Sequence, residues 1–168
     1  DLAKHLGARV IAVASTAEKR RVIETHYTPD VVLDPKDGFR EAVKEITGGG
    51  ADVIYDPVGG DVFDESVRCI AWGGRLLVVG FASGRIPTIP VNMPLIKGFS
   101  IIGVRAGEYG RRDPEAGRDN LEAVWDLAGS GAITPYVHAE LPLSKWRTAF
   151  SLMEDRALVG RVIINPNA

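Results

Sequence analysis

Residues 51–60 have the sequence ADVIYDPVGG, and this stretch decides the fold. Its first half, Ala51–Tyr55, is a short run with apolar β-branched residues at its centre, which predicts a strand. Its second half ends in two glycines and leads into a segment where Phe63, Val67 and Ile70 recur at helical spacing. A strand that turns tightly into a helix is the start of a βαβ unit, so the stretch predicts a parallel sheet.

The same alternation of strand and helix continues on both sides of this stretch. Apolar runs at residues 9–14 and 31–33 predict two earlier strands, and a run at 75–80 predicts a later one. Between the first two strands, Ser15 is expected to cap a helix, with Glu18 completing a capping box. The further expected helices are 39–46, ended by Gly48–Gly50, and 63–71, ended by Gly73 and Gly74. Together these elements predict an α/β protein with a doubly wound parallel sheet of the Rossmann type.

Beyond residue 80 the pattern changes. A proline-rich stretch at 86–94 leads to an apolar strand expected at 99–104, and a polar loop through Arg112 and Asp113 is expected to follow. A helix is expected near 121–128, because apolar residues recur there at intervals of three and four. The last elements expected are a helix near 146–153 and a strand at 161–164.

One part of a dinucleotide-binding fold is missing from the sequence. Such folds hold pyrophosphate with G-x-G-x-x-G after the first strand, and this chain contains no complete copy of that motif. Residues 1–7 instead have the pattern of the last turns of a helix closed by Gly7. We therefore expect the chain to begin inside a domain, without the first strand and its glycine turn. Because that strand is central in the order 3-2-1-4-5-6, we expect an interrupted sheet.

The composition excludes several function classes. The 168 residues are 45% hydrophobic and 25% charged, as in one ordinary globular domain. A net charge of −2 argues against a nucleic-acid partner, and no apolar run is long enough for a membrane span. The single cysteine, Cys69, excludes an internal disulfide and a multi-cysteine zinc site within these residues. It is expected to be a buried, unreactive thiol on a helix.

Several segments in order resemble the medium-chain dehydrogenase/reductase superfamily, and within it the NADPH:quinone oxidoreductases of the zeta-crystallin type. The segments are Ala8–Lys19, Asp56–Gly60, Gly73–Leu76 with Gly80–Gly84, Gly103–Arg112, and Leu141–Leu143 with Gly160–Val162. The resemblance implies a partial dinucleotide-binding domain over residues 1–132. It implies that residues 133–168 return to a GroES-like substrate domain that lies outside this chain. A zinc-free, cytoplasmic enzyme that dimerises through the strand near Phe99–Val104 is also implied.

The end of the second strand of such a fold decides the type of cofactor. Sites selective for NAD place an acidic residue there, whereas NADP sites offer cations and hydroxyls to the 2′-phosphate. This chain has Ser15 and Thr16 at that point, with Lys19 and Arg20 in the following turn. These four residues are therefore predicted to bind NADP(H). In the alternative interpretation Ser15 only caps the helix and the basic side chains are solvated.

Two further loops are predicted to contact the cofactor. Asp56, Val58 and Gly59 follow a strand at its carboxyl end, where open α/β sheets bind ligands. By resemblance this turn passes the adenosine side of the cofactor. Also by resemblance, the nicotinamide and its ribose would lie against Val79, Gly80, Phe81 and Ala82. The alternatives are a plain tight turn into a helix capped by Asp61, and a core aromatic at Phe81.

The resemblance implies hydride transfer from NADPH to a quinone or an activated enone. Such a reaction depends on how the cofactor and acceptor are oriented, so no nucleophile, triad or carboxylate pair is expected in this chain. Arg105 and Tyr109 could border the acceptor, or could be ordinary surface residues. An enoyl reductase of the same superfamily is the alternative enzyme. A non-catalytic nucleotide-binding or structural domain is the alternative of another class, and the sequence upstream would discriminate the two classes.

Overall fold

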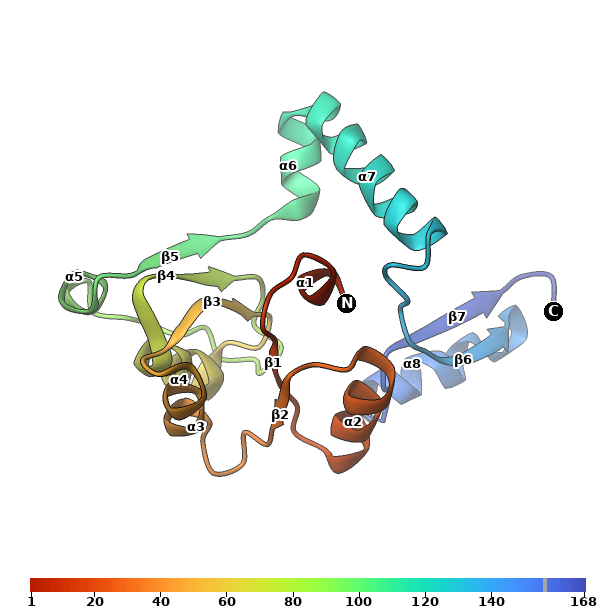
Figure 1. Ribbon diagram of the computed structural model, residues 1–168. Coiled ribbons are helices and arrows are strands. Elements are labelled where there is room, and N and C mark those ends of the chain that lie inside the picture. Colours follow the sequence, from red (N-terminus) through yellow and green to blue (C-terminus); the bar gives the residue numbers. More distant parts are fainter. Residues whose placement is uncertain (156) are drawn as a thin grey trace. The chain divides into compact units, whose positions relative to one another are not determined.

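The computed structural model describes residues 1–155 and 157–168 (Figure 1). These residues form two compact units. Unit 1 contains residues 1–33 and 122–168, and unit 2 contains residues 34–121. We describe each unit by itself.

The centre of unit 2 is a parallel sheet with the strand order β3-β4-β5. The strands are β3 (Ala51–Asp56), β4 (Ile70–Val78) and β5 (Ser100–Gly103). Ile54, Leu76 and Ile101 lie opposite one another across the three strands. The helices α3 (Arg40–Thr47) and α4 (Gly60–Cys69) cover one face of this sheet in Figure 1. The parallel α/β arrangement predicted from residues 51–60 is thus confirmed.

The core of unit 2 lies between α4 and the sheet. Leu76 is fully buried, and its cluster also contains Phe63, Val67, Ile70 and Phe99. On the other face of the sheet the alternate positions are open. There the residues are exposed, at 44% for Val53, 65% for Tyr55 and 39% for Ile102. Only one face of this sheet is therefore packed within unit 2 by the described residues.

The junction of α4 and β4 differs from the prediction. The helix ends at Cys69, and Ile70 and Ala71, expected on the helix, already belong to the strand. Ala51 pairs with Ile70, and the register shifts between Ala51 and Val53. Gly73 and Gly74 therefore lie within β4 and do not end the helix.

Three helices after β4 correct the predictions for residues 86–120. Helix α5 (Asn92–Lys97) begins inside the proline-rich stretch and continues beyond it. It can include Pro94, because proline is tolerated in the first turn of a helix. Helix α6 (Ala106–Arg112) replaces the expected polar loop. It is supported by Glu108, which pairs with Arg111 and Arg112 at spacings of three and four residues. Helix α7 (Pro114–Gly129) begins earlier than the helix expected near 121–128.

The first part of unit 1 contains α1 (Leu2–His5), β1 (Ile11–Val13), α2 (Ala17–Val22) and β2 (Val31–Leu33). The predicted glycine stop of the first helix is confirmed, since Gly7 has φ +79° and its N–H donates to Lys4 O at 2.9 Å. After α2 the chain continues as a π-helix, residues 23–27, and stops at Thr28 in the left-handed conformation. Strands β1 and β2 are parallel.

The second part of unit 1 contains a parallel pair of strands joined by a helix. These elements are β6 (Val137–Pro142), the 3₁₀ turn at residues 143–145, α8 (Trp146–Glu154) and β7 (Arg161–Asn165). The helix and the last strand were predicted, whereas β6 was not. The polar residues His138 and Glu140 and the terminal proline hide the apolar pattern of that strand.

Strand pairing is divided among three parallel sheets, β1-β2, β3-β4-β5 and β6-β7. None of the helices formed by the described residues combines the length and the apolar character that a membrane span requires.

Candidate functional site

The loops that follow β3 and β4 are hydrogen-bonded to each other at the carboxyl edge of the sheet in unit 2. Asp56 O accepts from Val79 N at 2.9 Å and from Gly80 N at 3.4 Å. Ala82 N then donates to Pro57 O at 3.1 Å. This pairing brings together the predicted cofactor residues of unit 2, namely Asp56, Val58, Gly59, Val79, Gly80, Phe81 and Ala82. Open parallel sheets bind ligands at this edge.

The side chain of Asp56 holds the first loop in shape. It is 2% exposed, and its Oδ1 accepts from Val58 N at 2.8 Å and from Gly59 N at 2.9 Å. The main-chain oxygen of the same residue holds the second loop, as described above. One buried residue therefore organises both loops, and its carboxylate is occupied by the protein itself.

Glycines allow these two loops to approach each other closely. Gly59 has φ +68°, and a Cβ there would lie 3.0 Å from Phe81 Cδ1 and 3.1 Å from Arg85 O. A Cβ on Gly80 would lie 3.2 Å from Pro57 O. Neither position has room for a side chain on the side of the neighbouring loop. Phe81 is 40% exposed, which contradicts the alternative of a core aromatic.

The start of α4 corrects one prediction and shows a residue that sequence reasoning missed. The N-cap is Gly59, without a side-chain hydrogen bond, and not Asp61. Asp61 lies in the first turn and pairs at 3.0 Å with Arg85, which also pairs with Asp64. Arg85 thus fastens the end of the second loop to the helix. No local spacing in the sequence connects it to residues more than 20 positions upstream.

The remaining predicted cofactor residues lie in unit 1, at the turn between β1 and α2. The N-cap of α2 is Thr16, whose Oγ1 accepts from Lys19 N at 3.2 Å, so the predicted capping box of Ser15 and Glu18 is wrong. The structure places Ser15 one position outside the helix, where it is exposed. Arg20 NH1 donates to Ala14 O at 2.9 Å, which holds this guanidinium against the end of β1.

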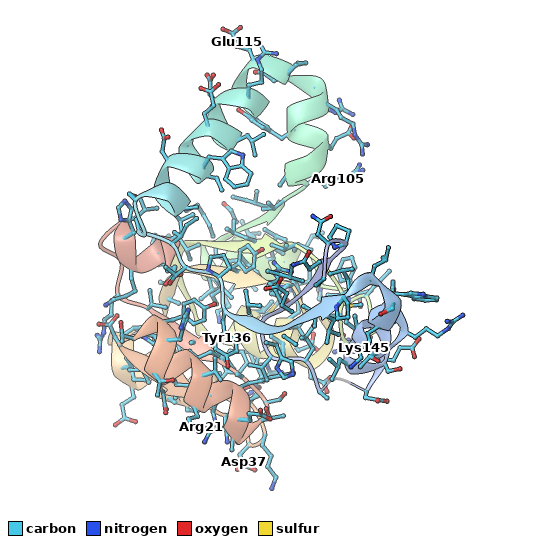
Figure 2. All side chains as sticks on the ribbon, turned by 90° about the vertical axis from the view of Figure 1, so that its right-hand side faces the viewer. Arg21, Asp37, Arg105, Glu115, Tyr136 and Lys145 are labelled. Atoms are coloured by element: carbon cyan, nitrogen blue, oxygen red, sulfur yellow. The ribbon has the colours of Figure 1, made fainter. Side chains whose placement is uncertain are left out.

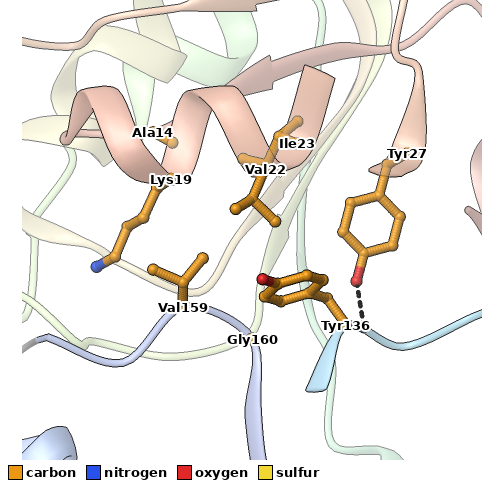
Figure 3. A pocket seen from close by; sticks show the side chains of 8 residues that line it. All are labelled: Ala14, Lys19, Val22, Ile23, Tyr27, Tyr136, Val159 and Gly160. Carbon is orange, nitrogen blue, oxygen red and sulfur yellow. Dashed lines mark hydrogen bonds between the residues drawn. The ribbon is translucent and has the colours of Figure 1, made fainter. Parts of the chain in front are cut away.

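A small hollow of about 180 Å³ lies beside this turn within unit 1 (Figure 3). Its lining consists of Ala14, Lys19, Val22, Ile23, Tyr27, Tyr136, Val159 and Gly160. The hollow is mostly apolar, and Lys19 is the one cationic residue in its lining. Tyr136 N donates to the Tyr27 hydroxyl at 2.7 Å, which connects the end of the π-helix to the chain before β6. The aliphatic part of the Lys19 side chain therefore has apolar neighbours on one side.

The single thiol of the chain is buried and unreactive. Cys69 is 1% exposed, as predicted, and burial raises its pKa to about 11, so the thiol stays protonated at neutral pH. Among residues 1–155 and 157–168, no three His, Cys, Asp or Glu side chains gather in a way that could hold a metal ion. The described residues thus do not fit a zinc ion.

The chain is similar to a known protein family and to several curated relatives. Residues 1–128 match the protein family described as zinc-binding dehydrogenase. A quinone oxidoreductase-like protein 2 homolog from Nematostella vectensis is 38% identical over 168 residues, covering 98% of this chain and 46% of the relative. A 2-haloacrylate reductase from a Burkholderia species is 32% identical over 171 residues, covering 99% of this chain and 50% of the relative.

A solved structure is also similar. A mycobacterial protein complexed with NADPH superposes with a TM-score of 0.84 at 34% identity, covering 98% of this chain and 51% of that protein. The chain thus spans about half the length of the curated relatives it matches.

Proposed function

The chain belongs to the zinc-binding dehydrogenase family, within the medium-chain dehydrogenase/reductase superfamily, and we propose that the protein containing it is an NADPH-dependent oxidoreductase. When bound, NADPH supplies a hydride from nicotinamide C4 to a quinone or an activated enone. The observation that carries the proposal is the hydrogen-bonded pair of loops after β3 and β4. They lie at the edge of a parallel sheet where ligands bind, and Gly59 and Gly80 allow the two loops to pack closely.

The proposed contacts of the cofactor divide between the two loops and the α2 turn. Asp56, Val58 and Gly59 form the adenosine side, and the residues proposed for the nicotinamide side are Val79, Gly80, Phe81 and Ala82. In unit 1 the hydroxyl of Ser15 and the amine of Lys19 are proposed to bind the 2′-phosphate. Thr16 and Arg20 take part in the same subsite, where their bonds to Lys19 N and Ala14 O also fix the turn. The three residues that directly follow β1, Ala14, Ser15 and Thr16, include no acidic residue, which favours NADPH over NADH.

Lys19 gives a direct test of the cofactor assignment. In the complete protein, Lys19→Gln should weaken NADPH binding about tenfold, because a charged hydrogen bond to the 2′-phosphate is lost. Binding of NADH, which has no 2′-phosphate, should change by less than about twofold by the same argument. Arg21→Gln, which removes a neighbouring exposed charge on α2, is the matched control and should change neither affinity. Equal losses for NADPH and NADH would contradict the assignment.

The activity itself is tested with purified complete protein and a panel of acceptors. Oxidation of NADPH at 340 nm with a quinone supports the quinone reductase. Oxidation with conjugated carbonyl compounds alone supports an enone or enoyl reductase, the second candidate, which the similarity to a 2-haloacrylate reductase favours. NADPH binding without oxidation in any of these assays would move the protein to the class of non-catalytic nucleotide-binding domains.

We propose further that the protein is a homodimer through residues 99–104, the segment that contains β5. This strand is at the end of the β3-β4-β5 order, and Ile102 on it is 39% exposed. An apolar edge strand is a pairing site for a second copy. Sedimentation at micromolar concentration should give twice the monomer mass, and Ile102→Lys should halve it. A monomeric unmodified protein would rule out the dimer.

Two other predictions from the family resemblance remain proposals. One is the division of the chain at residue 132 into a dinucleotide-binding part and a segment that returns to a substrate domain. The other is a cytoplasmic location, which fractionation of cells with an antibody to the protein would test.

A further inference from the structure

A second hollow lies in unit 2, immediately beyond β5. Its volume is about 640 Å³, and this open hollow is lined by residues from the end of β5, from α6 and from the first turns of α7. The polar side chains of its lining are Arg105, Glu108, Tyr109, Arg112 and Asn120. Figure 2 shows Arg105 at the end of α6 next to the sheet, and Glu115 at the opposite turn between α6 and α7.

The corner between the two helices is held by a close approach of glycines. A Cβ on Gly117 would lie 2.7 Å from the Cα of Gly110. The two helices therefore cross with their backbones in contact, and the hollow lies on the sheet side of this crossing. Its lining comes from two regular elements and a strand end, so its shape does not depend on a long loop.

The hollow is cationic. Glu108 accepts ion pairs from Arg112 at 3.1 Å, from Arg111 at 3.4 Å and from Arg105 at 3.8 Å. One carboxylate thus faces three guanidinium groups. Of these, Arg105 and Arg112 line the hollow together with Glu108, so the lining has an excess of one positive charge. The side chain of Glu108 is 24% exposed, whereas those of the three arginines are 78–79% exposed. Most of the arginine N–H donors are therefore directed to solvent and not to the protein.

The hollow lies beside the loop proposed for the nicotinamide. Val104 N donates to Val78 O at 2.9 Å, so β4 and β5 end side by side. Gly80 and Arg105 each follow their strand within two residues of that bond. Neighbouring strands are about 4.8 Å apart, so the first residues of the two loops start within reach of one acceptor molecule.

From this arrangement we propose that the hollow binds the acceptor through an anionic group, and that Arg105 and Arg112 determine this specificity. The inference rests on the proposed function and narrows its substrate class to conjugated acceptors that carry a carboxylate or a phosphate. Planar guanidinium groups bind both anions with paired hydrogen bonds. Exposed ion pairs contribute little to stability, so Arg112 can exchange Glu108 for a ligand at low cost.

The chemistry of a conjugated carboxylate balances with the proposed cofactor. A hydride from the dihydronicotinamide forms a C–H bond at the β-carbon, and the π-electron pair of the C=C bond moves to the α-carbon and the carboxylate. A proton from water then completes the C–H bond at the α-carbon. The acid is reduced and the dihydronicotinamide is oxidised. Negative charge increases at the carboxylate during this step, and two arginines there would stabilise it.

The test compares charged and neutral acceptors in the complete protein. We measure kcat/KM with NADPH for acrylate, for its neutral methyl ester and for acryloyl-coenzyme A. The kcat/KM for an anionic acceptor, divided by the kcat/KM for methyl acrylate, should fall about tenfold in Arg105→Gln and in Arg112→Gln. Each substitution removes charged hydrogen bonds to the anion. Arg111→Gln is the matched control, since Arg111 pairs with Glu108 but does not line the hollow. It should change the ratio less than about twofold.

Two further measurements complement the comparison of kcat/KM among the variants. Raising the salt concentration should increase KM for the anionic acceptor and not for methyl acrylate. Calorimetric titration of acrylate or coenzyme A into the unmodified protein should show binding that R112Q weakens. A loss confined to acrylate identifies the carboxylate as the bound group, and one confined to the coenzyme A ester identifies the phosphates.

The failures of the two proposals are distinct. If methyl acrylate and quinones are reduced while both arginine variants keep the ratio of the unmodified protein, the anionic specificity is wrong and the reductase stands. If neither the anionic nor the neutral acceptors support oxidation of NADPH, the proposed function itself is wrong.

Discussion

Replacing Gly50 with alanine should lower the free energy of unfolding by about 3 kcal/mol, through strain and backbone displacement at one position. Gly50 has φ +143°, which L side chains rarely adopt. A Cβ there would lie 2.7 Å from Ala71 N and 2.8 Å from both Cys69 O and Ile70 C. These atoms are backbone and cannot rotate away. The junction of α4 and β4 would have to shift as a whole.

The measurement is urea unfolding of the chain followed by circular dichroism, with Gly49→Ala as the matched control. No atom lies within 4 Å of a Cβ built on Gly49, and its φ is not in the left-handed region. This control should change stability by less than about 1 kcal/mol, the usual scale of a glycine-to-alanine change at a compatible site. Equal midpoints for G50A and G49A would show that β4 can move at no cost.

The contrast between Gly49 and Gly50 shows where sequence reasoning stops. The run Gly48–Gly50 predicts the end of a helix, and α3 does end at Thr47 with Gly48 left-handed. The three glycines are equivalent in the sequence. Only the packing of β3 against the start of β4 shows that Gly50 has no room for a side chain. A contact between segments 20 residues apart cannot be predicted from the local composition of either segment.

Local pattern predicted elements well where one face is buried in a regular repeat. Helix α4 and strand β4 follow from apolar spacing, because Phe63, Val67 and Leu76 pack in one core. Helix α8 also follows from its spacing, although Phe150 and Met153 on it are exposed. The errors lie where a second effect competes. Helix α5 was missed because proline usually ends helices, although Pro94 needs no partner for its nitrogen in the first turn. Helix α6 was missed because Gly107 and Gly110 weaken its propensity, while ion pairs to Glu108 support it.

The sequence predicts which segments follow the strands of unit 2, and not which contacts hold those segments together. The rule that ligands bind at carboxyl ends of parallel strands selects the segments after β3 and β4, and the structure joins them by hydrogen bonds. The rule does not say which side chain organises the loops. Ser15 and Thr16 are both plausible caps in the sequence, and only the helix start at Ala17 selects Thr16. The role of Arg85 depends on a contact with Asp61 that no spacing rule includes.

Asp56→Ala should destabilise the chain by about 2–3 kcal/mol, because it leaves two buried N–H donors without partners. The donors are Val58 N and Gly59 N, both within 2.9 Å of Oδ1 in a nearly closed environment. The loop would relax to satisfy them with water. Since the same residue's oxygen binds Val79 N and Gly80 N, the second loop should move with the first. We therefore expect the complete protein to lose NADPH affinity by more than about tenfold, the cost of reordering both loops on binding.

Asp56→Asn separates the hydrogen bonds from the charge. Its amide oxygen can accept from Val58 N and Gly59 N as the carboxylate does, so the loop should keep its shape. We expect the free energy of unfolding to fall by about 1 kcal/mol, because hydrogen bonds to a charged acceptor are stronger than those to a neutral one. NADPH affinity, measured by fluorescence titration, should stay within about threefold of the unmodified protein for the same reason. If D56N weakened NADPH as much as D56A, the carboxylate charge itself would matter to the cofactor, and its role would be contact and not loop support.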